Sequence, residues 1–233
     1  MALHGKRFVT AANLADRAKN YTLAEAVTLT KQMATAKFDE TIEMHFRLGI
    51  DPRHSDQQVR STVLLPAGLG KTVRVLVFAE GEEGRAAEAA GADIVADDDV
   101  INRIQNEGWM DFDAALATPN MMKKVGRVAR VLGPRGLMPN PKAGTVVQPD
   151  DLGRAVNELK AGRVEFRNDK TGNLHVAVGK ASFNADALLQ NAEAVMNAVI
   201  AQKPQGVKGI YIRRVVVTST MGPGVRVETV VPQ

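Results

Sequence analysis

The sequence predicts an α+β domain made from the two ends of the chain, with an α/β three-layer (Rossmann-like) domain inserted between them. Apolar and polar residues alternate with period two near both ends, whereas in the middle short apolar strands alternate with helices. The pattern changes at two glycine-bearing segments, 66–70 and 160–162. We therefore predict a terminal domain over 1–68 plus 160–233 and an inserted domain over 69–159.

The first part of the terminal domain is predicted to contain one helix and two strands. Thr22 and Glu25 have capping-box spacing, so a helix is expected from there to about Ala34. Residues 41–50 alternate cleanly, which indicates a strand with one face in solvent. A second strand is expected over 58–65.

The inserted segment has the pattern of a small parallel α/β layer. Residues 73–78 are almost continuously apolar, as in a buried parallel strand. Shorter strands are expected over 93–96 and 114–117. Helices are expected over 84–90, 100–107, 121–132 and 150–159.

The alternating pattern returns after Gly162. Residues 163–167 and 174–178 flank a polar turn, which predicts a β-hairpin. A long helix with one apolar face should follow from about 184 to 202. The chain should end with strands over 210–219 and 225–230.

Composition narrows the class of protein. Of 233 residues, 45% are apolar and 24% charged, which is ordinary for a globular protein. We expect no membrane association and no secretory signal, because no run approaches ~20 apolar residues and residues 1–10 lack an apolar core. The chain has no cysteine, which excludes disulfides, thiolate zinc sites and a cysteine nucleophile. A cytoplasmic location fits these features.

Charge is distributed unevenly. The net charge is +4, but residues 69–159 carry −3 and the flanking parts +7. Within the middle, residues 80–113 carry −9, whereas residues 114–149 contain six basic residues and no acid. This asymmetry favours a polyanionic partner, although solvated charged faces would give a similar pattern.

Enzyme motifs are incomplete. Gly70-Lys71-Thr72 resembles the end of a phosphate-binding loop, but Leu65 occupies the position of its first glycine and a strand follows. The first strand of the α/β layer lacks the glycine pattern of dinucleotide-binding proteins. The four histidines have no metal-ligand spacing. We expect neither an enzyme nor a cofactor or metal; a nucleotide-dependent enzyme remains the alternative from another class.

Two glycine- and proline-rich segments are better candidates for binding RNA. In residues 126–142, Arg135 and Lys142 lie in a run whose glycines would admit a phosphate backbone, although an ordinary connecting loop is an equal alternative. Residues 218–224 could offer hydroxyls and Met221 to RNA, or simply form a hairpin tip. The 4% aromatic content favours a structured RNA read by shape over stacked single strands.

Four segments resemble one family. AKFDETIEMHFRLGID (36–51), GPRGLMPNPKAGTV (133–146), GRVEFRNDKTG (162–172) and STMGPG (219–224) resemble bacterial large-subunit ribosomal protein L-one, in order and over nearly the whole chain. Ala129 and Arg130 stand where that family usually has glycine and lysine. We expect a slightly stiffer helix there.

The resemblance implies a structural constituent of the large ribosomal subunit. Proteins of that family bind large-subunit ribosomal RNA to form the mobile stalk, assist release of deacylated tRNA from the exit site, and repress translation of their own messenger RNA. We expect those three RNA partners, a ribosomal location in the cytoplasm, and a monomer off the ribosome. A nonspecific RNA chaperone is the second alternative.

The residue pattern and the resemblance together suggest site residues: the hinge follows from the two glycine-bearing crossings, the tRNA-facing segment from the charge pattern, and the ribosomal RNA contacts from the resemblance. Hinge positions are expected at Gly68, Gly70, Lys160 and Gly162. A basic segment facing tRNA is expected at Lys123, Lys124, Arg127, Arg130, Arg135 and Lys142. Ribosomal RNA is expected to contact Lys37, Phe38, Thr41, Glu43, Arg163, Phe166, Arg167, Asn168, Lys170, Thr220, Met221 and Gly222.

Overall fold

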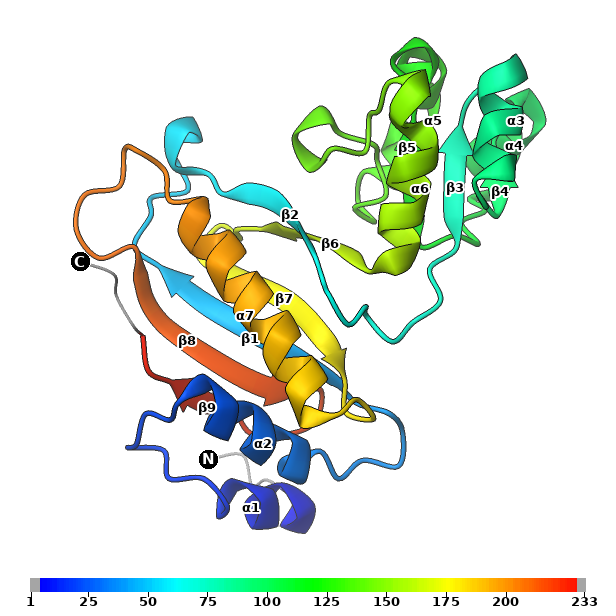
Figure 1. The fold of residues 1–233 in the computed structure, drawn as a ribbon. Helices are drawn as coiled ribbons and strands as arrows, with labels where there is room; N and C mark the ends of the chain where they lie inside the picture. The colour runs from blue at the N-terminus through cyan, green and yellow to red at the C-terminus, as the bar shows by residue number, and fades with distance from the viewer. Residues whose placement is uncertain (1–4, 230–233) are drawn as a thin grey trace. The chain divides into compact units, whose positions relative to one another are not determined.

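A computed structural model describes residues 5–229 of the chain. They form two compact units (Figure 1): unit 1 comprises the described residues up to Gly70 and from Val164 onward, and unit 2 comprises Lys71–Arg163. His4 and Val230, the predicted end of the last strand, lie outside the described residues, as does part of the segment that we searched for a secretory signal.

Unit 1 is built on a four-stranded antiparallel sheet. Its strand order is β7-β1-β8-β9, so the central strands come from opposite ends of the sequence. Two helices, α2 and α7, pack against this sheet (Figure 1). The bounds are β1 Thr41–Leu48, β7 Asn173–Lys180, β8 Ile212–Ser219, β9 Val225–Val227, α2 Leu23–Met33 and α7 Ala185–Ala201.

Alternation along β1 separates the core of unit 1 from its open face. Ile42, Met44, Phe46 and Leu48 are buried in a core with side chains of α7, whereas the residues between them are more exposed. The predicted capping box of α2 is present: the Thr22 side chain accepts from Glu25 N, and Glu25 accepts from Thr22 N. One face of the sheet is therefore covered, and the other presents polar side chains.

The predicted hairpin over 163–178 is wrong. Strand β6 (Arg163–Arg167) pairs with β2 (Arg60–Leu64) in a separate two-stranded sheet, whereas β7 joins the main sheet. A turn does connect them. Interactions between the β2 segment and the β6 segment explain why β6 does not pair with β7. Val59 N donates to Asn168 Oδ1 at 2.8 Å, and Arg60 pairs with Glu165. Helix α1 (Lys6–Ala12) was not predicted from the sequence.

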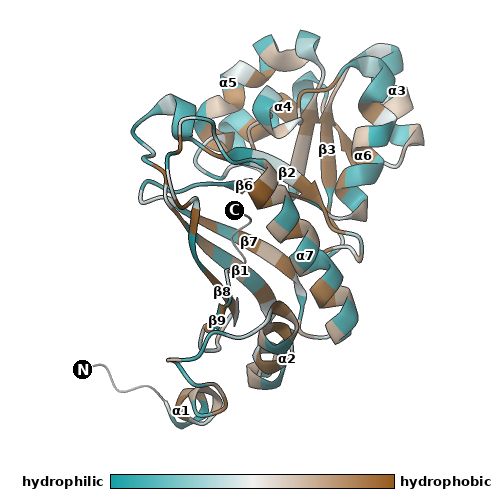
Figure 2. Cartoon of the chain, turned by 60° about the vertical axis from the view of Figure 1, so that its left-hand side comes forward, coloured by the Kyte–Doolittle hydropathy of each residue, from teal (hydrophilic) through white to brown (hydrophobic). Residues whose placement is uncertain are grey.

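Unit 2 contains a three-stranded parallel sheet with helices on both faces. The strand order is β4-β3-β5, and β3 (Val75–Phe78) is buried throughout and hydrophobic along its length in Figure 2. Alternate β3 residues enter two separate cores: Leu76 and Phe78 pack with α4 and α5, and Val75 and Val77 pack with α3 and α6. The other bounds are β4 Ile94–Val95, β5 Ala114–Ala117, α3 Gly81–Ala89, α4 Asp98–Glu107, α5 Met122–Leu132 and α6 Leu152–Ala161.

Short 3₁₀ helices lie in several of the segments that connect the strands and α-helices. Four 3₁₀ helices are described, three of which begin with proline, the residue favoured at a first helical position. They are Ser55–Gln57, Pro119–Met121, Pro141–Ala143 and Pro149–Asp151.

The predicted hinge residues have distinct local environments. Gly68, Gly70 and Gly162 have positive φ angles of 73°, 72° and 110°, a conformation that favours glycine. Asn191 of α7 hydrogen-bonds both Ala67 N and the Gly68 carbonyl, so this segment is anchored within unit 1. Lys160 lies in α6 and pairs with Asp93 at 3.1 Å, within unit 2.

Candidate nucleic-acid interface

Glu40 joins the two segments that the sequence singled out at opposite ends of the chain. Its side chain is only 2% exposed. One carboxylate oxygen accepts from Ala36 N at 2.7 Å and the other from Met221 N at 2.9 Å. Burial acts to raise the pKa of Glu40, but these backbone hydrogen bonds outweigh it and hold the pKa below its usual value. A buried anion thus holds the loop before β1 against the β8–β9 loop.

The neighbouring threonines reinforce this junction. Thr41 N donates to Thr220 Oγ1 at 3.0 Å, and Thr220 N donates to the Thr41 carbonyl at the same distance. Lys180 Nζ donates to Thr41 Oγ1 at 2.8 Å. The Thr220 hydroxyl is therefore engaged with protein backbone, and its clearest role is to align the two loops.

Two large apolar side chains project from the joined loops. Phe38 is 55% exposed and Met221 52% exposed, and Lys37 beside Phe38 is also exposed. Exposed aromatic and thioether groups next to a lysine suit contact with an unstacked base and its phosphate.

Gly222 leaves room for the side chain of the buried Ser219. A Cβ at this position would overlap Ser219 Oγ, and the next nearest atoms lie 3.6 Å or more away. The loop also closes on itself, because Gly222 N donates to the Ser219 carbonyl and Thr218 Oγ1 donates to the Gly222 carbonyl. A side chain here would force Ser219 to change rotamer or the loop to shift.

The third predicted segment divides into structural and accessible residues. The Phe166 ring is 1% exposed and belongs to the core of unit 1, so it is not presented for RNA contact. The Asn168 side chain accepts a hydrogen bond from Val59 N. Arg163 donates to Glu158 and to the Ala143 carbonyl within unit 2. Within this segment, the exposed cations are Arg167 and Lys170.

The turn that carries Lys170 is tightly bonded. Asp169 accepts from the backbone N–H groups of Thr171 at 2.8 Å and Asn173 at 2.7 Å. Burial opposes ionisation of Asp169, but these hydrogen bonds and those from the Thr171 and Asn173 side chains hold its pKa well below the usual value. Lys170 is thus displayed on a rigid turn.

The basic segment of unit 2 is partly neutralised. Lys124 pairs with Glu80 and with Asp98, so its charge is directed at acidic neighbours. Lys123, Arg127 and Arg130 are exposed and follow one another at four and three residues along α5, which places them on one helical face. Arg135 is exposed in the turn after α5, and Lys142 is exposed in the 3₁₀ helix Pro141–Ala143.

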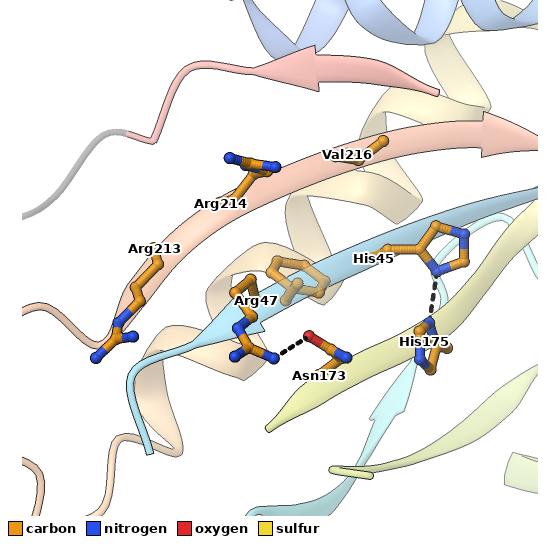
Figure 3. Close-up of a pocket in the computed structure, with 8 residues that line it drawn as sticks. His45, Arg47, Asn173, His175, Arg213, Arg214 and Val216 are labelled. Atoms are coloured by element: carbon orange, nitrogen blue, oxygen red, sulfur yellow. Dashed lines mark hydrogen bonds between the residues drawn. The ribbon is translucent and has the colours of Figure 1, made fainter. Parts of the chain in front are cut away.

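The open sheet face of unit 1 contains a shallow pocket that sequence analysis missed (Figure 3). It has a volume of about 450 Å³ and is lined by side chains of β1, β7 and β8. Only strand pairing brings these residues together, and their separation in sequence left no local signal. The polar and charged lining residues are His45, Arg47, Asn173, His175, Arg213 and Arg214.

The remaining classes of site were tested on the described residues. Residues 5–229 contain no group of three or more His, Asp or Glu that could hold a metal ion. Over the same range, no helix is both long and apolar enough to cross a membrane.

Similarity to known sequences decides the family. Residues 30–223 match the Ribosomal protein L1p/L10e family. The chain belongs to this family. The resemblance seen in the four sequence segments is thereby confirmed, and membership in a family of ribosomal proteins agrees with the prediction that the chain is not an enzyme.

Individual family members are similar over the whole chain. The "Large ribosomal subunit protein uL1" of Chloroflexus aggregans is 60% identical over 233 residues, which cover 100% of this chain and 98% of that protein. Its namesake in Chloroflexus aurantiacus is 58% identical with the same coverage. The protein of the same name in Thermosipho melanesiensis is 56% identical over 227 residues, 97% of each chain.

Proposed function

We propose that this L1-family protein is a constituent of the large ribosomal subunit and binds large-subunit ribosomal RNA through unit 1. The relatives' names supply the subunit. The observation that carries the binding surface is the Glu40 junction, which buries a carboxylate in order to hold two distant loops together. A buried charge with two backbone hydrogen bonds orders the exposed groups around it.

Each group at the junction has a chemical role toward folded RNA. Lys37 neutralises phosphate, whereas Phe38 and Met221 pack against unstacked bases. Glu43, half-buried on β1, accepts from ribose 2′-hydroxyls, which distinguish RNA from DNA. Arg167 and Lys170 add phosphate contacts from their own segment. Few bases need be read, because the shape of the RNA provides most of the selectivity.

A salt series tests this proposal directly. Affinity is measured for a ribosomal stalk RNA fragment and for an RNA of equal length and composition with a scrambled fold. We expect a large preference for the stalk fragment that persists at high salt. Equal affinities with a steep salt dependence would indicate counterion release alone, as for a nonspecific RNA chaperone, and would contradict the proposal.

For unit 2 we propose contact with tRNA at the exit site. The face formed by Lys123, Arg127 and Arg130, together with Arg135 and Lys142, supplies the positive charge. Lys124 is excluded because its acidic partners already neutralise it. The test is binding of deacylated tRNA to ribosomes that carry a triple glutamine variant of Lys123, Arg127 and Arg130. Faster tRNA exchange or weaker exit-site binding supports the contact, and an unchanged rate contradicts it.

A mobile ribosomal stalk requires that the two units of the chain can move as separate domains. We propose that the chain pivots where it passes between them, near Gly68–Gly70 and Lys160–Gly162. A variant in which a short flexible linker replaces residues 69–159 should fold, as judged by circular dichroism, and retain the preference for stalk RNA. Loss of binding by a folded variant would show that this division of labour is wrong.

The same surface is proposed to bind a similar RNA structure in the protein's own messenger and repress its translation. This predicts mutual competition between the messenger segment and the stalk fragment. Off the ribosome the protein is proposed to be a monomer, for which light scattering is the check.

A further inference from the structure

Three arginines surround the pocket on the open sheet face, and their charges are not neutralised. Arg47, Arg213 and Arg214 form no ion pair within residues 5–229. Arg47 instead donates to two neutral acceptors, the Thr171 carbonyl and Asn173 Oδ1, which hold its guanidinium in place. Figure 3 shows the bond to Asn173. The pocket therefore offers three positive charges to solvent.

The register of β1 and β8 places two of these arginines opposite each other, which destabilises the sheet when no ligand is bound. Arg47 lies directly opposite Arg214 across β1 and β8. Like charges in directly opposed positions destabilise a sheet unless a counter-charge lies between or beside them. The lining of the pocket includes no acidic residue. An anion bound at the pocket would relieve this repulsion.

Histidines form the other end of the pocket. His45 and His175 are also directly opposed, and their Nδ1 atoms lie 2.8 Å apart, so one ring donates to the other. The outer edges of the pair face acids: His45 Nε2 is 3.8 Å from Glu43, and His175 Nε2 is 3.8 Å from Asp169. The anion-binding end is consequently the arginine end.

The geometry of guanidinium groups points to phosphate. A guanidinium presents a planar fork of N–H donors that matches the oxygens of a phosphate group, and its charge persists at any relevant pH. A phosphodiester backbone carries such groups at regular spacing.

Strand β1 links the pocket to the proposed RNA surface. Thr41, Glu43, His45 and Arg47 alternate along β1 toward the open face. Arg47 at the pocket lies six residue steps along β1 from Thr41 at the Glu40 junction, which is about 20 Å at the usual rise of a strand. One folded RNA can span that distance, so the occupant need not be a second molecule.

We propose that the pocket bounded by Arg47, Arg213 and Arg214 is a phosphate-binding subsite that holds the backbone of the same RNA bound at the Glu40 junction. This inference rests on the proposed function of unit 1. It adds a contact made by charge and shape rather than by bases, at the opposite end of β1. The subsite contributes affinity and orientation, whereas selectivity among RNAs of similar fold remains at the junction.

The test compares two full-length variants that lose the same charge. The pocket variant carries Arg213→Gln and Arg214→Gln. The control carries Arg17→Gln and Arg85→Gln, two exposed arginines that form no ion pair in the described chain and lie outside the pocket. Because all four side chains are exposed, both variants should fold, which thermal unfolding verifies. Binding of the stalk RNA fragment is then measured from 0.05 to 0.3 M salt, ~0.1 M being the reference.

We expect the pocket variant to lose about tenfold to a hundredfold in affinity at the reference salt. The slope of log affinity against log salt should become shallower by about 1–2. In the control variant, the loss of affinity and the change in slope should each be no more than about a third of those in the pocket variant. Replacing both pocket arginines by lysine should restore the slope but only part of the affinity, because lysine keeps the charge and lacks the fork.

Failures of the two proposals are distinguishable. If wild-type protein prefers the stalk fragment but pocket and control variants behave alike, the subsite is wrong and the proposed function stands. If wild-type protein shows no preference for the stalk fragment, the proposed function itself fails and the subsite fails with it.

Discussion

Met221 N donates a 2.9 Å hydrogen bond to Glu40 Oε2, across 181 residues of sequence. The other oxygen of Glu40 accepts from Ala36 N, so each oxygen of this nearly inaccessible carboxylate accepts a backbone hydrogen bond. This bond makes one surface out of two loops, and loss of either acceptor oxygen should affect both.

Glu40→Gln should destabilise the protein by about 1–3 kcal/mol, because an amide NH₂ would face one of the two N–H donors and leave it unpaired. RNA affinity should fall as well, since the Met221 loop loses its anchor. Urea unfolding and RNA titration measure the two effects. The control is Glu193→Gln on the exposed side of α7, which should change the free energy of unfolding by less than about 0.5 kcal/mol.

The Glu40 contribution should depend on pH. Its pKa in the folded protein lies below the ordinary value of 4.5. The folded state therefore favours the carboxylate, and this stabilisation is complete above the unfolded-state pKa and declines as pH falls through the folded-state pKa. The difference in unfolding free energy between wild type and Glu40→Gln should be largest near pH 7 and shrink below about pH 4.5. A constant difference down to pH 3 would contradict this account.

Met221→Ala should weaken specific RNA binding by about 1–3 kcal/mol, the range for a side chain that packs on a base. Because Met221 is about half exposed, the free energy of unfolding should change by less than about 0.5 kcal/mol. The control is Leu64→Ala, which truncates a side chain of similar size and 50% exposure on β2. Unchanged RNA affinity in Met221→Ala would leave residues 219–224 as an ordinary hairpin tip.

Gly222→Ala should lower both stability and RNA affinity. The new Cβ would overlap Ser219 Oγ, and relief requires this buried side chain to change rotamer or the loop to shift, at a cost of about 1–3 kcal/mol. Ser219→Ala removes the overlapping atom, so the double variant should recover much of the loss in a double-mutant cycle. Gly126→Ala is a control of opposite sign: it lies within α5 with open space around it and should stabilise by about 0.5–1 kcal/mol.

Periodicity and capping predicted most helices and strands of this chain because those signals are local. The capping box at Thr22, the buried run of β3 and the alternation of β1 each depend on residues within a few positions of one another. Helix α1 escaped prediction because it is seven residues long and Gly5 provides no side-chain cap. The β6–β7 hairpin was wrong because a turn between two strands does not specify which strands they pair with.

Site residues were predicted less completely for the same reason. Lys37, Phe38 and Met221 were recognised from their segments and are exposed together with the loops that carry them. Phe166 lies in an equally suggestive segment, yet the alternation of β6 turns its ring into the core. Glu40 and the arginine pocket have no sequence signature, since Glu40 anchors a loop 181 residues away and the pocket unites residues from strands that are distant in the sequence.

His45→Gln should reduce the pH dependence of RNA binding. Burial lowers the pKa of His45, the neighbouring His175 lowers it further, and Glu43 partly opposes both, so in the free protein the ring is mostly neutral at pH 7. A phosphate held nearby by Arg47 and the β8 arginines favours the protonated ring, and the complex then binds more protons than the free protein.

Affinity of the wild-type protein should therefore rise as pH is lowered from 8 to 6, by up to about tenfold more than that of His45→Gln, since one unit of pKa change corresponds to a factor of ten. Fluorescence anisotropy at constant ionic strength measures the difference. The control is His54→Gln, an exposed histidine in the loop after β1 that does not line the pocket. Parallel pH profiles for wild type and His45→Gln would mean that no RNA phosphate lies close to the histidine pair.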